Sequence, residues 1–520
     1  MNEQLFMNKT PTRRDFLKLA TLAPILATAT YAGQATLQSA QSFNRPNVLF
    51  ILFDTLSARH MSLYGYPRET TPNLKRFAKR ATVFHKHYAG GNYTSPATAS
   101  LLTGAYTWSQ RGFNFMATVS EEFERQHIFR VFADAGYYRF AYTHNWLAAQ
   151  LLNQFRSDIT YWKPTRELCL TDTEFSDQLF ANDHAVALAA ERVTAEHGTV
   201  GTGSLFLSLL NRFVVSNERK ALMEKYAARF PKGLPTNLET TLFVMEDAID
   251  WVQLQVMQAP RPFFGYIHLL PPHEPYRPRE EFTHLFINDR LTAVPKPLHP
   301  LSNTRFDEQS QNVTRRNYDQ YVAYADSEFG RLYDFLQQSG LLDTTYLIFT
   351  ADHGQLFERG TKGHFNSLLY ESITHIPLLI SAPGQNKRFN VRKPTSCLDV
   401  LPTLAQIAEQ PIPVWGEGQL LPRFGGQANS ERSIFTVEAK SNAKAAPITK
   451  ATVSMIKDNY KVIHYRGYDK GYQNVFEVYD LDQDPQELTD LHSIKPETSS
   501  ELEHEMIAKL DEVNRPYQRG

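Results

Sequence analysis

The sequence predicts an α/β fold with a mostly parallel central sheet and helices on both of its faces. Three apolar runs of strand length carry this prediction, because strands buried on both faces of a parallel sheet read as near-continuous hydrophobic segments. The runs are residues 47–53, 345–350 and 376–380. Asp54 follows the first run and Asp352 the second. Since open α/β sheets place their functional sites at the carboxyl ends of strands, we expect the two carboxylates to meet.

Local patterns predict further elements in chain order. A Thr-Pro start signal at residues 71–72 predicts a helix over 73–80, and apolar strand patterns cover 139–143 and 263–268. A strong amphipathic helix pattern covers 318–339, where aromatic residues recur at helical spacing. Helices and strands that alternate in this way are typical of α/β proteins.

The composition places the chain among ordinary globular proteins. Its 520 residues are 42% hydrophobic, 21% charged and 12% aromatic, which excludes disorder, collagen-like repeats and a coiled coil. At about 150 residues per domain, the length predicts roughly three domains, or one large α/β domain with an appendage. A net charge of -1 gives no electrostatic reason to expect nucleic acid as a partner. Two cysteines, Cys169 and Cys397, make at most one bridge.

Residues 1–43 are predicted to be an export leader. Arg13-Arg14 stands in a basic segment, and the moderately apolar stretch 19–32 ends in small residues. This pattern resembles a twin-arginine signal, which implies export by the twin-arginine machinery to the periplasm or the cell exterior, with cleavage near residues 29–32. Pro24 interrupts the short stretch, so we expect no transmembrane span in the mature chain. The alternative is an amphipathic N-terminal helix that packs on the domain.

We predict a catalytic domain over residues 44–430 and a small α+β C-terminal subdomain over 431–520. Within the first domain, residues 170–256 are helix-rich and carry no chemical motif, which indicates an insertion or a lid. Prolines and polar residues over 280–314 predict a long surface excursion. The subdomain prediction rests on two β-type segments and one charged amphipathic helix, at residues 451–465, 475–481 and 496–514.

Taken one at a time, the polar residues near these elements have structural explanations as well as chemical ones. An Asp after a strand can cap the next helix, and Thr94 can be a plain N-cap. His268, inside an apolar run, is more often a core histidine than a ligand. The Asp352-His353-Gly354 motif is more telling, because a carboxylate and an imidazole after a buried strand can face one cleft, with Gly354 permitting a tight turn.

The joint order and spacing of the motifs resemble the sulfatase family within the alkaline-phosphatase-like superfamily. The resemblance spans roughly residues 45–490 and rests on ordered blocks at residues 45–54, 62–66, 71–74, 100–104, 262–264, 272–273, 349–354, 376–380, 399–404 and 479–485. It implies an alkaline-phosphatase-like sandwich and one divalent metal. The implied metal ligands are Asp54, Thr94, Asp352 and His353. Such a donor set favours Ca²⁺, Mg²⁺ or Mn²⁺ and also accepts Zn²⁺.

Departures from the family pattern bear on the chemistry. Thr94 stands where sulfatases of the usual kind have Cys or Ser, and Thr98 stands where they have Arg. That motif directs oxidation to formylglycine, so no formylglycine is expected. A formylglycine hydrate has one hydroxyl to attack sulfur and a second to expel sulfate, whereas threonine has only one. Thr55 and Pro271 replace acidic residues of many family members, which argues for a single metal.

The resemblance also implies groups that hold or protonate a tetrahedral anion. The segment 361–364 follows the Asp-His-Gly motif, where family members supply an anion-binding Lys or His. Residue 144 follows a predicted strand, where other members have Lys and His. If these residues lie outside the site, they are solvated surface groups. The predicted catalytic residues are Thr94, His273 and His364, and the predicted substrate-binding residues are Lys362, His144 and Asn145.

The sequence therefore predicts an exported, metal-dependent hydrolase or transferase with Thr94 as its nucleophile. Phosphoesters or phosphodiesters are the preferred substrates, because water can open a phospho-threonine. The substrate would be a small molecule, or an ester linked to a glycan or lipid. One alternative is a true sulfatase with an unmodified threonine. The other is a catalytically silent protein that binds anionic glycans or lipids.

Overall fold

The structure is a computed structural model that describes residues 45–171, 205–238, 241–302, 306–427, 429, 431–469 and 471–518. The predicted leader over residues 1–43 lies outside the described residues, as does the part of the helix-rich segment over 172–204. None of the described helices is both long and apolar enough to cross a membrane. Cys169 and Cys397 are free thiols, so the bridge that the sequence allows does not form.

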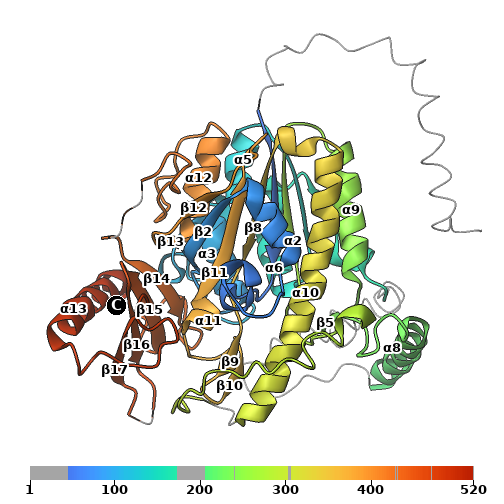
Figure 1. Ribbon diagram of the computed structural model, residues 1–520. Coiled ribbons are helices and arrows are strands. Elements are labelled where there is room, and N and C mark those ends of the chain that lie inside the picture. Colours follow the sequence, from blue (N-terminus) through green and yellow to red (C-terminus); the bar gives the residue numbers. More distant parts are fainter. Residues whose placement is uncertain are drawn as a thin grey trace, which may run out of the picture. The chain divides into compact units, whose positions relative to one another are not determined.

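A nine-stranded sheet runs through the centre of the described chain (Figure 1), in the order β12-β2-β11-β8-β1-β7-β3-β4 with β13 paired to β2. The inner strand β1 is parallel to both of its neighbours, β7 and β8. Within the described part of this sheet, only the pairings of β11, with β2 and β8, are antiparallel. The strands are β1 (Asn47–Phe53), β2 (Thr82–Tyr88), β3 (Tyr138–Thr143), β4 (Tyr161–Trp162), β7 (Phe263–Leu269), β8 (Thr345–Ala351), β11 (His375–Ser381), β12 (Phe389–Val391) and β13 (Thr395–Ser396).

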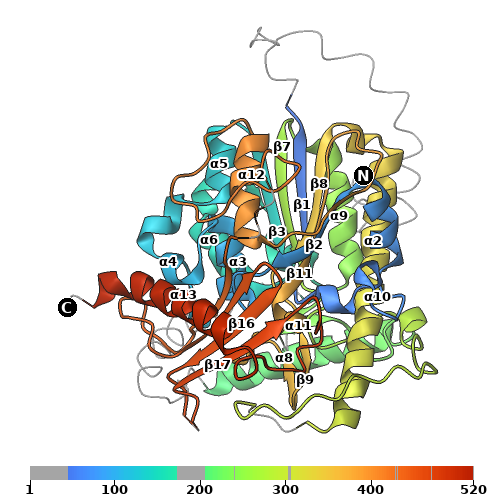
Figure 2. The ribbon, with the colours of Figure 1, turned by 60° about the vertical axis from the view of Figure 1, so that its left-hand side comes forward.

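Helices cover both faces of this sheet, as Figures 1 and 2 show. On one face, Phe329 of α10 contacts Phe349 of β8 at a ring-centroid distance of 5.0 Å. On the other face, Phe132 of α5 stacks on Phe264 of β7 at 4.1 Å. The first group of helices is α2 (Pro72–Phe77), α9 (Met245–Gln258) and α10 (Glu308–Gln338); the second is α3 (Thr94–Thr103), α5 (Ile128–Asp134), α6 (Trp146–Gln154) and α12 (Val400–Ile407). The predicted mostly parallel α/β sandwich is confirmed.

Two segments differ from the sequence expectations. The long helix α10 begins at Glu308, inside the predicted surface excursion over 280–314, because the Asp307 carboxylate accepts a hydrogen bond from Ser310 N and caps the helix. The helix α9 lies within the predicted insertion over 170–256, yet its apolar side is buried in the central core. The last part of that segment therefore belongs to the sandwich. Helix α8 (Leu205–Tyr226) lies earlier in the same segment.

The C-terminal region forms a second sheet, as predicted. Four antiparallel strands pair in chain order within the described residues from 431 to 518 (Figure 2). Helix α13 (Pro496–Asn514) buries Met506 and Leu510 in the hydrophobic core. The strands are β14 (Ile434–Glu438), β15 (Ala451–Lys457), β16 (Tyr460–Arg466) and β17 (Asn474–Asp480).

A buried ion cluster joins this sheet to α11 (Glu371–Thr374), the short helix before β11. The Lys461 ammonium on β16 is fully buried and lies 3.1 Å from Glu371 and 2.9 Å from Glu487. Replacing Lys461 with Met would leave two buried carboxylates without their cation, so we expect the free energy of unfolding to fall by about 3–5 kcal/mol. Denaturant melts of Lys461→Met measure this loss. The partly exposed pair between Lys457 and Glu505 is the control, and Lys457→Met should cost less than about 1 kcal/mol.

Candidate active site

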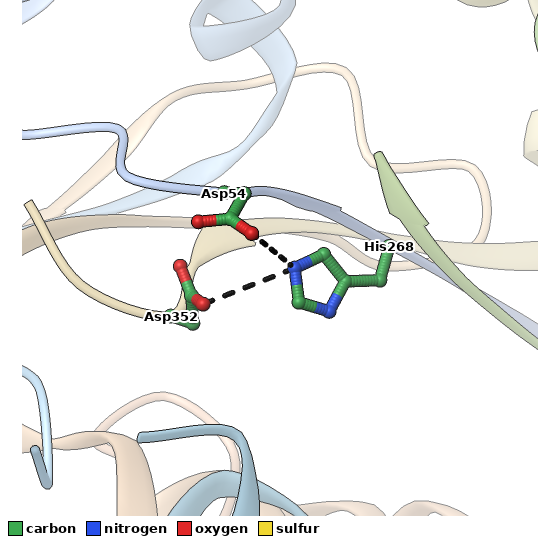
Figure 3. A group of neighbouring side chains, drawn as sticks. All are labelled: Asp54, His268 and Asp352. Carbon is green, nitrogen blue, oxygen red and sulfur yellow. Dashed lines mark ion pairs between the residues drawn. The ribbon is translucent and has the colours of Figure 1, made fainter. Parts of the chain in front are cut away.

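Three side chains meet at the carboxyl ends of β1, β7 and β8, as Figure 3 shows. Asp54 follows β1, His268 lies near the end of β7, and Asp352 follows β8. Nε2 of His268 lies 3.4 Å from Oδ2 of Asp54 and 3.8 Å from Oδ2 of Asp352. All three side chains are buried. The expected meeting of the two carboxylates at this edge is confirmed.

Four buried atoms of this cluster have no hydrogen-bond partner among the described residues. They are Oδ1 of Asp54, Oδ2 of Asp352, and Nε2 of both His268 and His353. His353 donates its Nδ1 proton to the Gly354 carbonyl at 3.0 Å, so its Nε2 carries a lone pair. That atom lies 3.4 Å from Asp352 and 3.7 Å from Asp54. Because buried polar atoms are nearly always paired, convergent carboxylate and imidazole atoms of this kind fit one divalent metal ion.

The pKa values of Asp54 and Asp352 are shifted because the two carboxyl groups are buried close together. Burial, together with the charge of Asp54, raises the pKa of Asp352 to about 7. Burial would also raise the pKa of Asp54, but contact with His268 and the charges of nearby histidines outweigh it and lower that pKa. Two carboxyl groups in one dry site cannot both ionise without a counter-charge. A bound cation relieves that repulsion.

The backbone around the cluster is strained and tightly packed. Thr55 has a φ of 60°, a conformation that β-branched residues rarely adopt. Its N–H donates to Oδ1 of Asp352 at 3.1 Å, and its carbonyl accepts from Tyr318 at 2.6 Å, so the strain is held by hydrogen bonds on both sides. Gly354 is needed for close approach rather than for a turn, because a Cβ there would lie 2.1 Å from the Ser372 carbonyl oxygen.

The structure brings Thr94 and Asn145 to the same cluster. Thr94 is the first residue of α3, and its Oγ1 lies 3.1 Å from Nδ2 of Asn145. The same amide group donates to Oδ2 of Asp54. The Asn145 oxygen accepts from Leu147 N at 2.8 Å and Ala148 N at 3.3 Å at the start of α6, which fixes the orientation of the amide. Asn145 therefore holds the Thr94 hydroxyl beside Asp54.

His273 and His364 lie next to the cluster and differ in their pKa shifts. Their ring centroids are 4.9 Å apart, and His364 is 4.5 Å from His353. Burial, with the charges of the neighbouring histidines, lowers the pKa of His364. Burial would lower the pKa of His273 too, but Asp54 and Glu274 outweigh it and raise that pKa. These surroundings favour the neutral form of His364 and the protonated form of His273.

Gln355 fixes the tautomer of His364. Its amide nitrogen donates to Glu274 at 2.6 Å and to the Tyr276 hydroxyl at 2.7 Å, so its oxygen must accept from Nδ1 of His364 at 2.7 Å. Nε2 of a neutral His364 is therefore an acceptor. No sequence signal indicates this tautomer, because it depends on the hydrogen bonds of Gln355 with Glu274 and Tyr276.

Two predicted substrate ligands lie elsewhere. Lys362 is exposed on β10 (Thr361–Gly363), with its ammonium 4.2 Å from the centroid of Phe306. His144 is fully buried behind the cluster and stacks on Phe243 at 4.1 Å. Burial, with the neighbouring His268, lowers the pKa of His144 to about 3. The Lys362 side chain makes no contact with the carboxylate cluster among the described interactions. His144 lies beside the cluster: its backbone N–H donates to the His268 carbonyl at 3.1 Å, and its two ring nitrogens have no hydrogen-bond partner among the described residues.

His268 corrects the expectation of a satisfied core histidine. It is buried, but its Nε2 faces both carboxylates without a hydrogen-bond partner. The signal that could have found it is its place near the carboxyl end of a buried apolar run, the rule that singled out Asp54 and Asp352.

We expect His268→Ala to weaken metal binding at least about tenfold, because it removes one of four convergent donor atoms. Competition with a metal-binding dye measures the affinity. His464→Ala is the control, since His464 is equally buried but lies in the C-terminal sheet, where its ring stacks on Phe476. Equal affinities of the two variants would place His268 outside the donor set.

Comparison with known proteins agrees with the geometry of the site. A family model described as "Sulfatase" matches residues 46–410, and one described as "N-sulphoglucosamine sulphohydrolase, C-terminal" matches residues 360–516. The chain is 26% identical to a choline-sulfatase from Rhizobium meliloti over 86% of this chain and 82% of that protein. It is 29% identical to arylsulfatase K from Xenopus laevis, over 51% of this chain and 55% of that protein.

Solved structures show the same fold. The phosphonate monoester hydrolase of Agrobacterium radiobacter superposes with a TM-score of 0.63 at 18% identity, over 90% of this chain and 95% of that chain. The alkaline-phosphatase-like sandwich expected from the sequence is thereby confirmed. The family match covers more than two thirds of the chain and includes every residue of the carboxylate cluster. The chain therefore belongs to the sulfatase family, whose members are hydrolases of ester bonds.

Proposed function

We propose that this protein hydrolyses phosphate esters through Thr94, with one divalent metal as its cofactor. The observation that carries the proposal is the placement of the Thr94 hydroxyl, which Asn145 holds beside Asp54 at the edge of the unpaired donor cluster. A metal held by Asp54, Asp352, His353 and His268 would supply positive charge to the nucleophile and to the transferring group.

The chain's residues and solvent account for the proton transfers. The Thr94 hydroxyl releases its proton to solvent, and its Oγ1 forms a bond to phosphorus as the bond to the leaving oxygen breaks. His273, whose protonated form Asp54 and Glu274 favour, donates a proton to that leaving oxygen. His364, kept neutral with Nε2 as an acceptor, then takes a proton from the water that opens the phospho-threonine. As phosphate leaves, the proton on His364 returns to Oγ1 of Thr94, and solvent reprotonates His273, so each group regains its starting state.

The preference for phosphorus over sulfur follows from the single hydroxyl of threonine. A sulfo-threonine has no second hydroxyl to expel sulfate, so water would have to attack sulfur directly. The second candidate is a sulfatase that works with unmodified Thr94, and the sulfatase names of the curated relatives favour it. The third is a silent binding protein, and the retained donor cluster weighs against it.

An aromatic wall borders the site and indicates the shape of the leaving group. It consists of Phe115, Trp146 and Phe365. The ring of Phe115 lies 5.7 Å from that of Trp146 and 5.5 Å from that of Phe365. Phe115 is 52% exposed and Phe365 is 49% exposed, which is unusual for large apolar side chains. Trp146 directly follows Asn145 and Phe365 directly follows His364, so the wall belongs to the mouth of the site.

The charged group beside this wall limits which alcohol the substrate can carry. The Lys440 ammonium lies 4.9 Å from the centroid of Phe365 and already occupies the neighbourhood of that ring. Because Lys440 pairs with Glu438 at 2.9 Å and is held at that ring, a second cation would have to displace it. We therefore expect the alcohol part of the substrate to be a neutral or anionic ring, rather than a quaternary ammonium alcohol such as choline.

The donor atoms of the site limit which divalent metal ion it favours. Two imidazoles, from His268 and His353, join the carboxylates of Asp54 and Asp352, a mixed donor set in which imidazole suits Zn²⁺ and carboxylate suits Mn²⁺. We expect purified protein to hold one Mn²⁺ or Zn²⁺ per chain and to lose activity on chelation. Elemental analysis and reconstitution of the chelated protein measure both. Full activity after exhaustive chelation contradicts this prediction.

The experiment that tests the proposed function is a comparison of turnover by metal-loaded protein. The substrates are 4-nitrophenyl phosphate, bis-4-nitrophenyl phosphate, a phosphonate ester and 4-nitrophenyl sulfate, which share one leaving group. The proposal requires a phosphorus ester to be the best of the four. Faster turnover of the sulfate ester supports the second candidate instead, and no turnover with any metal supports the third.

We also propose that the twin-arginine leader exports the folded, metal-loaded chain. The support is the Arg13-Arg14 pair before an apolar stretch that ends in small residues. Replacing both arginines with lysine should retain the protein in the cytoplasm. Cell fractionation that finds the double variant outside the cytoplasm would contradict this route.

A further inference from the structure

A second cavity lies apart from the carboxylate cluster. Its volume is about 370 Å³, and none of the metal-cluster residues lines it. Its walls come from the turns after β1, the loop that precedes α10, and β9 (Leu356–Glu358). The charged and aromatic residues of these walls include Arg59, Tyr64, Tyr66, Lys296, Arg315, Phe357 and Glu358.

Arg315 of α10 is the unusual group in this cavity. Its side chain is about nine-tenths buried, because the residue is only 9% exposed. The guanidinium donates to Asn312 at 2.8 Å, but its Nε has no hydrogen-bond partner. In the described part of the chain, no carboxylate forms an ion pair with it. A buried cation without a counter-ion is costly, so an anion that entered the cavity would offset that cost.

Arg59 adds a second unpaired cation to the same walls. The half-buried Arg59 lines the cavity and forms no direct ion pair in the described part of the chain, although its charge acts on nearby Glu358 and Glu371. Two guanidinium groups that face one space are the usual means of binding an oxyanion, because each presents several N–H donors in a fixed plane.

The surrounding acidic groups do not cancel this charge. Glu358 is the one acidic residue among the described residues that line the cavity, and it pairs with Lys296 at 2.7 Å. Asp319, behind the wall, accepts from Tyr66 and pairs with His60 and Arg68. Glu371 pairs with Lys461. Glu358 and Glu371 thus have direct cation partners of their own and only partly offset the charge of Arg59, and no described carboxylate pairs with Arg315.

Aromatic rings form the rest of the wall. Tyr64, Tyr66 and Phe357 line the cavity, and His60 contacts both Tyr66 at 5.0 Å and Phe357 at 5.6 Å. Rings beside cationic groups suit a ligand that carries an anionic group on a body with an apolar face. The volume exceeds what an inorganic anion fills and suits an organic molecule of about monosaccharide size.

We propose that this cavity is a second binding site, which takes a small organic oxyanion between Arg59 and Arg315. The shared chemistry of the ligand is a phosphate, sulfate or carboxylate group on a ring of about sugar size. The site holds no nucleophile or carboxylate pair of its own among the described residues, so it binds without catalysis. It does not depend on the reaction proposed for Thr94.

The test counts binding sites by calorimetry in the metal-loaded Thr94→Ala protein, which cannot turn the ligand over. Titration with glucose 6-phosphate should show two sites per chain, one at the catalytic cluster and one in the cavity. Adding Arg315→Gln should remove one site or weaken it at least about tenfold. Adding Arg316→Gln should leave both, because the neighbouring Arg316 does not line the cavity. An unchanged pair of sites in Arg315→Gln overturns the proposal.

Further experiments test the proposal even if the Arg315→Gln variant does not fold. Arg59→Gln, on a turn rather than in a long helix, should weaken the same site. Glucose 6-sulfate and glucuronate identify which anionic group binds most tightly, and glucose is the neutral control. Equal binding of glucose overturns the proposal. Selenate soaked into crystals should give an anomalous peak between the two guanidinium groups, whereas peaks confined to the catalytic cluster overturn it.

If the proposed reaction at Thr94 is wrong, the result looks different. A chain whose catalytic cluster binds no phosphate ester would show one site in Thr94→Ala and none after Arg315→Gln is added. A chain whose cavity is empty would show one site in both proteins. The two failures are therefore distinguishable.

Discussion

Asp352→Ala is expected to abolish metal retention and turnover together. Its Oδ2 is one of four convergent unpaired atoms, and its Oδ1 accepts the N–H groups of Thr55 and His353. The substitution therefore removes a donor and loosens the strained turn that carries Asp54. We expect kcat/KM to fall by about 10³-fold or more, with loss of the bound metal. Elemental analysis and steady-state kinetics on the same preparation measure both effects.

Asp326→Ala is the matched control for Asp352→Ala. Asp326 is an equally buried aspartate on α10, but its carboxylate accepts the backbone N–H groups of Asn73 and Leu74 at the start of α2. Its removal should lower stability and leave the metal content of the folded protein unchanged. If Asp352→Ala keeps its metal, or turns over at more than a tenth of the wild-type rate, the assignment of Asp352 as a ligand is wrong.

The sequence was sufficient for the part of the site that follows directly from strand ends. Asp54 and Asp352 each stand after an apolar run, and the parallel pairing of β1 with β8 brings such positions to one edge. His353 follows from its neighbour. The part of the C-terminal sheet from β15 to β17 was also predictable, because these strands follow one another closely and pair in chain order. Residues 439–450 separate β14 from β15, and the sequence pattern did not predict β14.

The rest of the site depends on contacts between distant segments. His268 lies within an apolar run, and only the register that pairs it with Leu52 of β1 shows that its ring faces the carboxylates. Lys362 was misplaced because β10 pairs with β9 in a short hairpin, which sets Lys362 opposite Phe357 and leaves it exposed. A sequence pattern does not contain these registers.

The prediction of the long helix α10 was likewise correct in one part and incomplete in another. The aromatic periodicity over 318–339 marked the buried part of α10, since Tyr321, Tyr324 and Phe329 pack in the core. The first turns of the helix carry mostly polar residues, so the periodicity did not reach them, and the Asp307 cap defines the start instead. Hydrophobic periodicity predicts where a helix is buried, whereas caps predict where it begins.

The remaining large effect concerns Thr94, because its substitution separates the candidate reactions. We expect Thr94→Ala to lose about 10³-fold or more in kcat and still bind substrate, since only the nucleophile is removed. Thr94→Ser should keep activity within about tenfold, because the hydroxyl survives. Thr103→Ala is the control in the same helix: its hydroxyl bonds only to the Ala99 carbonyl and the Ala105 N–H, so turnover should be unchanged.

Direct detection of the intermediate decides the chemistry. Rapid quenching with a slow phosphate ester should leave one phosphoryl group on the peptide that contains Thr94, measured by mass spectrometry. Thr94→Cys should not produce a formylglycine sulfatase, because Thr98 still occupies the position where the oxidation motif has Arg. If sulfate esters turn over faster than every phosphorus ester while Thr94 remains unmodified, phosphorus is not the preferred centre. The single hydroxyl held by Asn145 would then have to release sulfate through direct attack of water on sulfur.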